Sequence, residues 1–351
     1  MSTPISRPAC GGIPSEAAVF PFLLKSGQSV SNCLGSEAAL GAVQFGGDLD
    51  RFDRFGEIPR FKLPLQELGG HTFAEVWLSS SQVSYGSMQN FAYGADGQSL
   101  LGFVRLAESD GPTPEQLAHK AYLRFLRAAR ELGYPHIARV WNYLSGINRS
   151  LLGLERYQRF SLGRYQAFEE FGMRFDADLP AATAIGIPQP DCGLWVYFLA
   201  RRQPGVHIEN PRQVSAYRYP LQYGPKSPSF SRATLIETGG EALLFISGTA
   251  SIRGHATVHA DDLIGQLQET AVNIEALLSQ PQLPWRKTLS QLNEQDHLKV
   301  YVRHAADADV IQAWLREVVH PSCPTVMLHG DICRPDLLVE IEGVVRYAPV
   351  A

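Results

Sequence analysis

The sequence predicts an α+β fold in which one unit of strands and helices occurs twice. Short apolar or alternating runs, typical of strands, are separated by Gly and Ser turns, and amphipathic helical segments stand between them. The succession of strands, helix, strand, helix and two strands then recurs, each time over roughly 130 residues. The length of 351 residues suits one duplicated core with a lead-in. We therefore expect mixed β-sheets covered by helices.

The predicted division of the chain has three parts. Residues 1–70 are rich in Gly, Ser and Pro and show weak periodicity except around residues 20–24 and 61–65, so we expect an extended, partly ordered lead-in. The regular core is expected to begin after it. The first unit is predicted over residues 71–205 and the second over residues 206–351.

The first unit is predicted to open with an antiparallel meander. Its three strands are expected at residues 73–78, 88–93 and 100–106. A helix follows, because Thr113 supplies a capping hydroxyl before Pro114 and Glu115, and it ends at Gly133. The remaining elements are expected as a strand at 136–144, a helix at 153–171, and strands at 182–187 and 194–200.

The second unit repeats this order. Its clearest helix, at residues 261–278, carries its apolar residues on one stripe. The other elements are expected as strands at 233–237 and 242–252, a strand at 297–302, a helix at 307–319, and strands at 325–328 and 336–345.

The composition excludes several classes of protein. There are 31 Lys and Arg against 35 Asp and Glu, a net charge of −4, so we expect no general nucleic-acid or anionic-membrane binding. No window approaches the roughly 18 uninterrupted apolar residues that a membrane helix needs. Residues 1–16 do not resemble a secretory signal. We expect a cytoplasmic protein.

Nothing in the sequence calls for a metal or a cofactor. The five cysteines are an odd number without CxxC spacing, which indicates neither a disulfide framework nor a zinc site. His255 and His259 precede Asp261, but we favour a structural interpretation with Asp261 as a helix N-cap. No phosphate-binding glycine motif is present, so no nucleotide is required.

The last strand is the sharpest chemical signal. Val339 and Ile341 alternate with Glu340 and Glu342, so the two carboxyl groups share one face. Two like charges on a cleft-lining face raise one pKa and leave a protonated Glu able to act as a general acid. The alternative is a solvated outer sheet face, which from this strand alone is favoured.

Cys333 stands beside Arg334 just upstream of this strand. A guanidinium next to a thiol lowers the thiol pKa and makes it a nucleophile or proton carrier. The alternative is an ordinary free cysteine near a turn, and from the dipeptide alone this alternative is favoured.

Arginines and tyrosines in two segments suggest an anionic ligand with carboxylates. Arg156, Tyr157 and Arg164 lie near one face of the predicted helix at 153–171. Tyr219 and Arg232 belong to a non-periodic segment, rich in Pro and Gly, of the kind that lines pockets. The alternatives are a surface basic helix or RNA binding, which the acidic net charge makes less favoured.

Two families resemble this sequence. Residues 247–255, with the sequence Ser-Gly-Thr-Ala-Ser-Ile-Arg-Gly-His, the helix after them and the strand with Glu340 and Glu342 resemble the YjgF/Rid-like domain. One departure is that the arginine of Rid deaminases would fall near Thr325. Together with the arginine-rich helix, residues 212–232 and the ending Cys-Arg-Pro-Asp-Leu-Leu-Val-Glu-Ile-Glu, the chain from residue 70 resembles the chorismatase family.

The resemblance implies an enzyme that cleaves chorismate, releases pyruvate and needs no cofactor. It implies two YjgF/Rid-like (chorismate-mutase-like) units with a pseudo-trimeric core, in a monomer or a homo-oligomer. It assigns the acid role to Glu340. The pocket would contain Tyr157, Arg164 and Tyr219, to which the residues above add Arg156 and Arg232.

Gly248 and Cys333 match the pattern of family members that make 3-hydroxybenzoate, and related enzymes release 4-hydroxybenzoate. We accordingly expect Gly248 at the substrate and Cys333 as a catalytic proton carrier. Three alternatives stay open: a chorismate hydrolase that forms a dihydroxycyclohexadiene carboxylate, a Rid-type imine deaminase, and a ligand-binding module.

Overall fold

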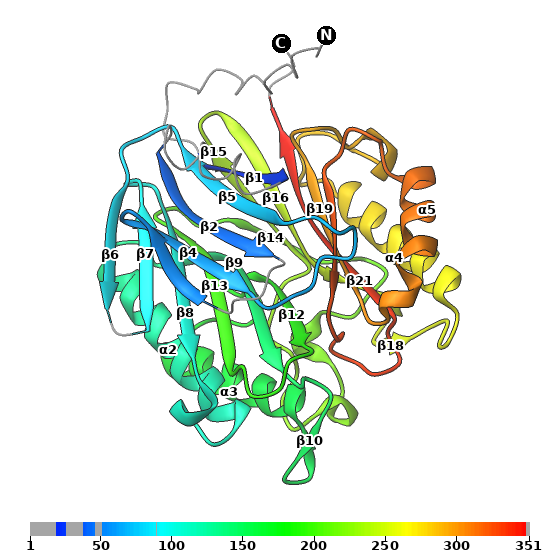
Figure 1. Ribbon diagram of the computed structural model, residues 1–351, viewed down its shortest axis with the longest axis horizontal. Helices are drawn as coiled ribbons and strands as arrows, with labels where there is room; N and C mark the ends of the chain where they lie inside the picture. Colours follow the sequence, from blue (N-terminus) through cyan, green and yellow to red (C-terminus); the bar gives the residue numbers. More distant parts are fainter. Residues whose placement is uncertain (1–18, 26–37, 46–50, 89, 349–351) are drawn as a thin grey trace.

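Three β-sheets face one another around a shared core in the computed structural model, which describes residues 19–25, 38–45, 51–88 and 90–348 (Figure 1). The core contains side chains from all three sheets, among them Trp77, Trp141, Tyr197, Phe245 and Leu328. Two pairs of helices cover the outer faces of two of the sheets.

The middle sheet has six strands in the order β12-β9-β13-β8-β7-β6. Only the β12–β9 pair is parallel. Its strands are β6 (Ser84–Met88), β7 (Phe91–Ala95), β8 (Ser99–Leu106), β9 (His136–Ser145), β12 (Ala181–Ile187) and β13 (Leu194–Arg201). Helices α2 (Pro114–Glu131) and α3 (Arg156–Phe171) pack on its outer face.

The C-terminal sheet also has six strands, in the order β14-β15-β16-β21-β19-β20. Only the β19–β20 pair is parallel. Its strands are β14 (Val206–Ile208), β15 (Ala233–Thr238), β16 (Glu241–Thr249), β19 (His297–Val302), β20 (Thr325–His329) and β21 (Val339–Tyr347). Helices α4 (Leu263–Leu278) and α5 (Ala308–Val318) cover its outer face.

These two sheets confirm the predicted duplication. Read from the parallel pair outward, both have the same strand order and the same strand directions. In each unit one helix follows the third strand and the second helix connects the two parallel strands. The α+β class and the mixed sheets covered by helices are therefore confirmed.

The N-terminal sheet corrects the expectation of an extended lead-in. It has the order β1-β5-β2-β4-β3, and four of its strands precede residue 70. Its strands are β1 (Val19–Lys25), β2 (Ala39–Phe45), β3 (Arg51–Phe55), β4 (Ile58–Leu63) and β5 (Phe73–Ser79). Apolar residues such as Val43, Phe45 and Phe61 are fully buried. The expectation failed because these strands are short and, apart from the β3–β4 hairpin, pair over longer sequence distances, which local periodicity does not show.

This sheet is also a partial third copy of the unit. The run β1-β5-β2-β4 has the order and directions of β8-β13-β9-β12 and of β16-β21-β19-β20. Three related sheets thus surround the core, which is the expected pseudo-trimeric arrangement. Within the described residues, the partial copy has no counterpart of the outer two strands or of the helices.

The predicted meander is wrong in two respects: its first strand belongs to another sheet, and its second strand spans the end of one strand and the start of the next. Strand β5, expected to join it, pairs instead with β1 and β2. The run predicted at 88–93 is a hairpin, because Asn90 has a φ of 59° and ends β6 before β7 begins. Two short ribbons complete the fold, β10 (Ser150–Leu151) with β11 (Leu154–Glu155) and β17 (Ile252–Arg253) with β18 (Ala256–Thr257).

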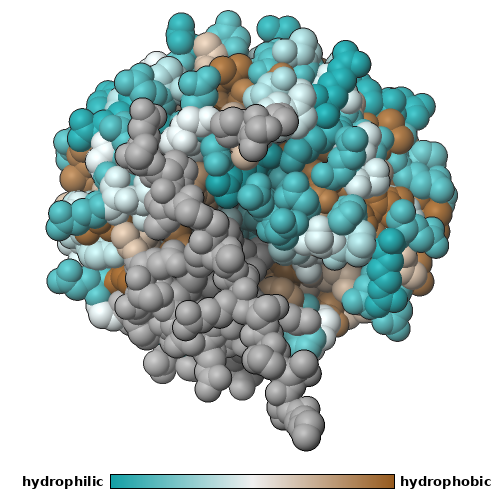
Figure 2. Space-filling model, turned by 90° about the horizontal axis from the view of Figure 1, so that it is seen from above, coloured by the Kyte–Doolittle hydropathy of each residue, from teal (hydrophilic) through white to brown (hydrophobic). Residues whose placement is uncertain are grey.

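One face of the molecule is mixed in polarity. On the face that Figure 2 shows, hydrophilic residues surround small hydrophobic patches outside the grey region. Among the described residues, no helix has the length and hydrophobicity needed to cross a membrane.

Candidate active site

Strand β21 lies in the interior of the C-terminal sheet, between β16 and β19, and its two faces differ. Val339 and Ile341 point toward the helix layer and pack with the apolar side chains of α4 and α5. Glu340 and Glu342 lie on the opposite face and are only 4% and 1% exposed. The interpretation of this face as a solvated sheet surface is therefore wrong, because the other two sheets cover it.

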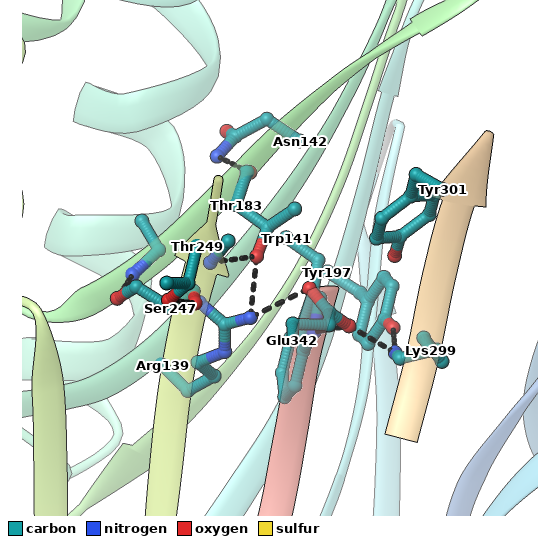
Figure 3. Close-up of polar contacts among 12 residues, drawn as sticks. Arg139, Trp141, Asn142, Thr183, Tyr197, Ser247, Thr249, Lys299, Tyr301 and Glu342 are labelled. Atoms are coloured by element: carbon teal, nitrogen blue, oxygen red, sulfur yellow. Dashed lines mark hydrogen bonds and ion pairs between the residues drawn. The ribbon is translucent and has the colours of Figure 1, made fainter. Parts of the chain in front are cut away.

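Glu342 is held as an anion by two cations. Its carboxylate lies 2.7 Å from Lys299 Nζ and 2.7 Å from Arg139 Nη2, and Trp141 Nε1 donates a 2.8 Å hydrogen bond to it (Figure 3). Burial raises the pKa of Glu342, but Lys299 and Arg139 outweigh it and hold the pKa below its usual range. Glu342 is therefore a fixed negative charge next to Glu340.

Glu340 has the opposite character. Burial and the neighbouring charge of Glu342 raise its pKa to about 8, although Arg139, Arg232 and Arg303 act in the other direction. The carboxyl group is therefore mostly protonated at neutral pH. A buried carboxyl that holds its proton at this pH is suited to general acid catalysis.

Gly248 makes the position of Glu340 possible. The pairing of β16 with β21 shifts its register between Ile246 and Thr249, so Gly248 sits at an irregularity beside the acid. A Cβ atom on Gly248 would lie 1.9 Å from Glu340 Oε1. The Gly248 amide donates a 2.9 Å hydrogen bond to Thr183 Oγ1, which ties this strand to the middle sheet. A side chain at residue 248 would displace the acid.

Cys333 lies in the loop between β20 and β21, where an ionised Glu340 would oppose the ionisation of its thiol. Burial and Glu340 raise the pKa of its thiol to about 12. Arg334 acts to lower this pKa, as expected, but burial and Glu340 outweigh it, so the expectation of a lowered thiol pKa is wrong. The Arg334 guanidinium itself donates to Thr257 and to the His255 carbonyl. Cys333 is therefore a neutral thiol at neutral pH, not a thiolate nucleophile.

Tyr157 and Arg164 reach the same region from α3. Tyr157 is 9% exposed, and its titration responds to Cys333, Arg164 and Glu340. Burial raises its pKa, so the hydroxyl remains protonated. Arg164 is 1% exposed, and its Nε and Nη2 have no hydrogen-bond partner. Buried guanidinium donors without a partner are suited to an anionic ligand.

The segment before β15 completes this region. Arg232 donates hydrogen bonds to Tyr219 Oη at 2.7 Å and to the Val214 carbonyl at 2.9 Å, and its Nε is unpartnered. The guanidinium carbons of Arg164 and Arg232 lie 5.9 Å and 5.2 Å from the centre of the Phe230 ring. The structure therefore brings together Glu340, Cys333, Tyr157, Arg164, Tyr219, Arg232 and Gly248.

Arg156 does not join this group. Its guanidinium donates to Glu108 at 2.5 Å and to the Ser145 carbonyl at 2.9 Å. It starts the first turn of α3, where it faces the end of β9 and the segment after β8. Its spacing from Tyr157 and Arg164 indicated a common face, but its charge is already neutralised by Glu108.

Sequence reasoning missed three cations around the site. Arg139 and Lys299 contact Glu342, while Arg303 donates hydrogen bonds to the carbonyls of Ile332, Arg334 and Leu337, which fixes the loop that carries Cys333. Arg139 and Lys299 interrupt apolar strands, and a charged residue buried in such a strand requires a partner. These charges within apolar strands were the sequence signal that could have predicted buried ion pairs.

The histidine pair near residue 255 has structural contacts. His255 Nδ1 lies 3.1 Å from Tyr223 Oη, and the N-cap of α4 is Asp262, not Asp261 as predicted, because the Asp262 side chain accepts the Gly265 amide. Within the described part of the chain, no three His, Cys, Asp or Glu side chains gather as metal ligands would.

Known proteins are similar to this protein over most of its length. The family model described as "Chorismatase FkbO/Hyg5-like, N-terminal" matches residues 75–200. A 3-hydroxybenzoate synthase of Streptomyces hygroscopicus is 38% identical over 82% of this chain and 85% of its own length, and a chorismatase of that species is 37% identical over 89% and 90%. A crystal structure of chorismatase, 35% identical, superposes with a TM-score of 0.86 over 94% of this chain and 99% of that one. The chain therefore belongs to the chorismatase family.

Proposed function

We propose that this protein cleaves chorismate to pyruvate and 3-hydroxybenzoate, with Glu340 as the general acid. The observation that carries the proposal is the buried, protonated carboxyl of Glu340 beside Gly248 and Cys333. The name of the 38% identical relative, 3-hydroxybenzoate synthase, supports the product. The names of the other relatives support chorismate as the substrate.

The unpartnered arginine donors suit this substrate. Chorismate carries a ring carboxylate and an enolpyruvyl carboxylate, and guanidinium groups bind carboxylates through paired hydrogen bonds. Nε and Nη2 of Arg164 and Nε of Arg232 have no partner in the structure. In the proposal, these two arginines with Tyr157 and Tyr219 hold the dianion, and its enol ether faces Glu340.

The first chemical step is a proton transfer. Glu340 donates its proton to the methylene carbon of the enol ether, which becomes a methyl group, and positive charge develops on the ether carbon. The anion of Glu342 and the newly formed anion of Glu340 stabilise this oxocarbenium-like centre. The oxygen of the neighbouring ring hydroxyl then bonds to this carbon. Its bond to the ring and the ether bond at the same carbon break, so pyruvate leaves with that oxygen as its carbonyl oxygen. The ring keeps the ether oxygen, which takes up the proton of the hydroxyl group.

Aromatisation completes the reaction. The ring gives up one C–H proton, which balances the proton that Glu340 donated, and the ring retains one hydroxyl. Pyruvate and 3-hydroxybenzoate together contain the same atoms as chorismate, so no co-reactant is required. In the proposal Cys333, a neutral thiol near Glu340, carries a proton in this second stage.

The related alternative is attack by water on the same centre, which yields pyruvate and a dihydroxycyclohexadiene carboxylate. Incubation of the purified protein with chorismate, followed by chromatography and a pyruvate assay, distinguishes the outcomes. Equal amounts of pyruvate and 3-hydroxybenzoate are expected. Pyruvate with only the dihydroxy acid would establish hydrolysis, and the absence of pyruvate would overturn the proposal.

A further inference from the structure

Four charged side chains from all three sheets form a continuous buried chain next to the acid. Glu75 comes from β5, Arg139 from β9, Lys299 from β19 and Glu342 from β21. None of them is more than 1% exposed. The N-terminal sheet thereby contributes a charge to the centre of a site whose reactive groups lie in the other two sheets.

The contacts in this chain are short. Lys299 Nζ lies 2.5 Å from Glu75 and 2.7 Å from Glu342, and Glu342 lies 2.7 Å from Arg139. Trp77 Nε1 donates a 2.8 Å hydrogen bond to Glu75, and Lys299 donates one of 2.8 Å to Tyr197 Oη. Figure 3 shows Glu342 between Arg139 and Lys299.

The four charges sum to zero. Two carboxylates and two cations compensate one another, and such compensation is required because an unpaired charge is costly to bury. Glu75 and Glu342 together raise the pKa of Lys299 above its usual range against the effect of burial. An ionised Glu340 would add a fifth charge to this balanced set.

Other groups that face Glu340 come from several elements. Arg232 and Arg303 favour its anion, but they also donate hydrogen bonds to Tyr219 and to loop carbonyls, respectively. The neutral groups are Cys333, Tyr157 and Tyr301, the last being opposite Glu340 in the β19–β21 register. Among these groups, the four buried charged side chains determine the net charge next to the Glu340 carboxyl group.

We propose that Glu75 and Lys299 are positioning residues for the reaction, which hold Glu342 as a compensated anion and thereby set the pH at which Glu340 gives up its proton. The inference rests on the proposed role of Glu340 as the acid. It gives the N-terminal sheet a task in catalysis, although no residue of that sheet is placed against the substrate.

The charge balance gives opposite expectations for a single and a double substitution. Glu75→Gln removes one anion, and the three charged side chains that remain then carry a net positive charge. Glu340 should therefore lose its proton at a pH about one unit lower. Adding Lys299→Met to Glu75→Gln restores neutrality, since Glu342 and Arg139 remain paired. The double variant should therefore titrate close to the wild type.

Infrared spectroscopy follows this titration without turnover. The band of the buried protonated carboxyl is assigned to Glu340 by its loss in Glu340→Gln, and its pH dependence is measured in each variant. In parallel, the high-pH decline of pyruvate release from chorismate should move with the band. If the wild type releases no pyruvate, the proposed function fails, while the infrared titration still tests the charge chain.

The matched control is Lys287→Met, which breaks another buried ion pair, Lys287 to Asp296 at 3.1 Å, in the C-terminal half of the chain. It should leave the Glu340 titration unchanged. An unshifted band in Glu75→Gln, or a double variant that titrates like Glu75→Gln, would overturn the proposal.

If Glu75→Gln does not fold, Lys299→Met alone provides the test. It leaves one uncompensated anion, so either Glu340 keeps its proton to a higher pH or a second protonated carboxyl band emerges. A spectrum identical to that of the wild type would contradict the proposal.

Discussion

The two repeated units share a strand order but differ on the inner face of one equivalent strand. In β13 this face carries Trp195, Tyr197 and Leu199, which pack in the shared core. In β21 the corresponding face carries Glu340 and Glu342. The strand order therefore builds the same scaffold twice, whereas buried carboxyl groups are present on only one of these two faces.

The two helices of the middle unit pack closely against each other. In the middle unit α2 and α3 approach closely at Gly163, where a Cβ atom would lie 2.0 Å from the Glu115 carbonyl oxygen. This close packing holds α3, which carries Tyr157 and Arg164. In the proposed mechanism the middle unit supplies Tyr157 and Arg164 on a helix, and the C-terminal unit supplies Glu340 on a strand, so the reaction requires both units.

The largest effect is expected from Glu340→Gln. The amide keeps the shape of the side chain but cannot donate the proton, so pyruvate release from chorismate should fall by about 10³-fold. Steady-state assays of pyruvate measure this loss. The matched control is Trp195→Phe on the corresponding face of β13, which should leave the rate close to that of the wild type. Comparable losses in both variants would contradict the assignment of the acid to β21.

Gly248→Ala should have the next largest effect. The added methyl group forces Glu340 away from its position, and a displacement of this kind lowers kcat by about 10²-fold. Measurement of kcat together with the fraction of 3-hydroxybenzoate tests this expectation. Wild-type kcat and product distribution would show that residue 248 need not be glycine.

Arg164→Met should weaken substrate binding more than it changes the chemistry. Loss of charge-assisted hydrogen bonds to a carboxylate raises KM by about 10-fold or more. The control on the same helix is Arg156→Met, because Arg156 is engaged by Glu108. It should lower the free energy of unfolding by about 1 kcal/mol and leave KM unchanged. A KM effect in Arg156→Met alone would reverse the assignment of the two arginines.

Cys333→Ala should have the smallest effect on total turnover. Pyruvate release depends on Glu340 and should persist, whereas the ratio of 3-hydroxybenzoate to other ring products should change because a proton carrier is lost. Chromatography of the products at equal pyruvate release measures this ratio. An unchanged ratio would remove Cys333 from the mechanism.

Much of the scaffold could be predicted because its signals are local. The helices at 114–131 and 263–278 have capping residues and apolar stripes, and the alternation around Glu340 identified the shared face of the two carboxyl groups. The N-terminal sheet was missed because its strands are short and β1, β2 and β5 pair at long range. Arg139 and Lys299 were missed for the same reason, since their partners are distant in sequence.

The burial of β21 shows where local patterns reach their limit. Alternation places Glu340 and Glu342 on one face but does not reveal whether solvent or protein covers that face. The pKa of Cys333 presented the same problem, because the sequence shows its neighbour Arg334 but not the burial and the nearby Glu340 that outweigh it. Only the packing of three sheets determines both environments.

The pH dependence of kcat/KM for pyruvate release from chorismate tests the central claim most directly, because this parameter reports the ionisation of the free enzyme. Glu340 must be protonated to act as the acid, and its pKa is raised to about 8 by burial and by Glu342. We predict that kcat/KM falls as the pH rises through about 8, and that this decline is absent in Glu340→Gln. A wild-type value that remains constant from about pH 6 to about pH 10, or a decline that persists in Glu340→Gln, would contradict the account.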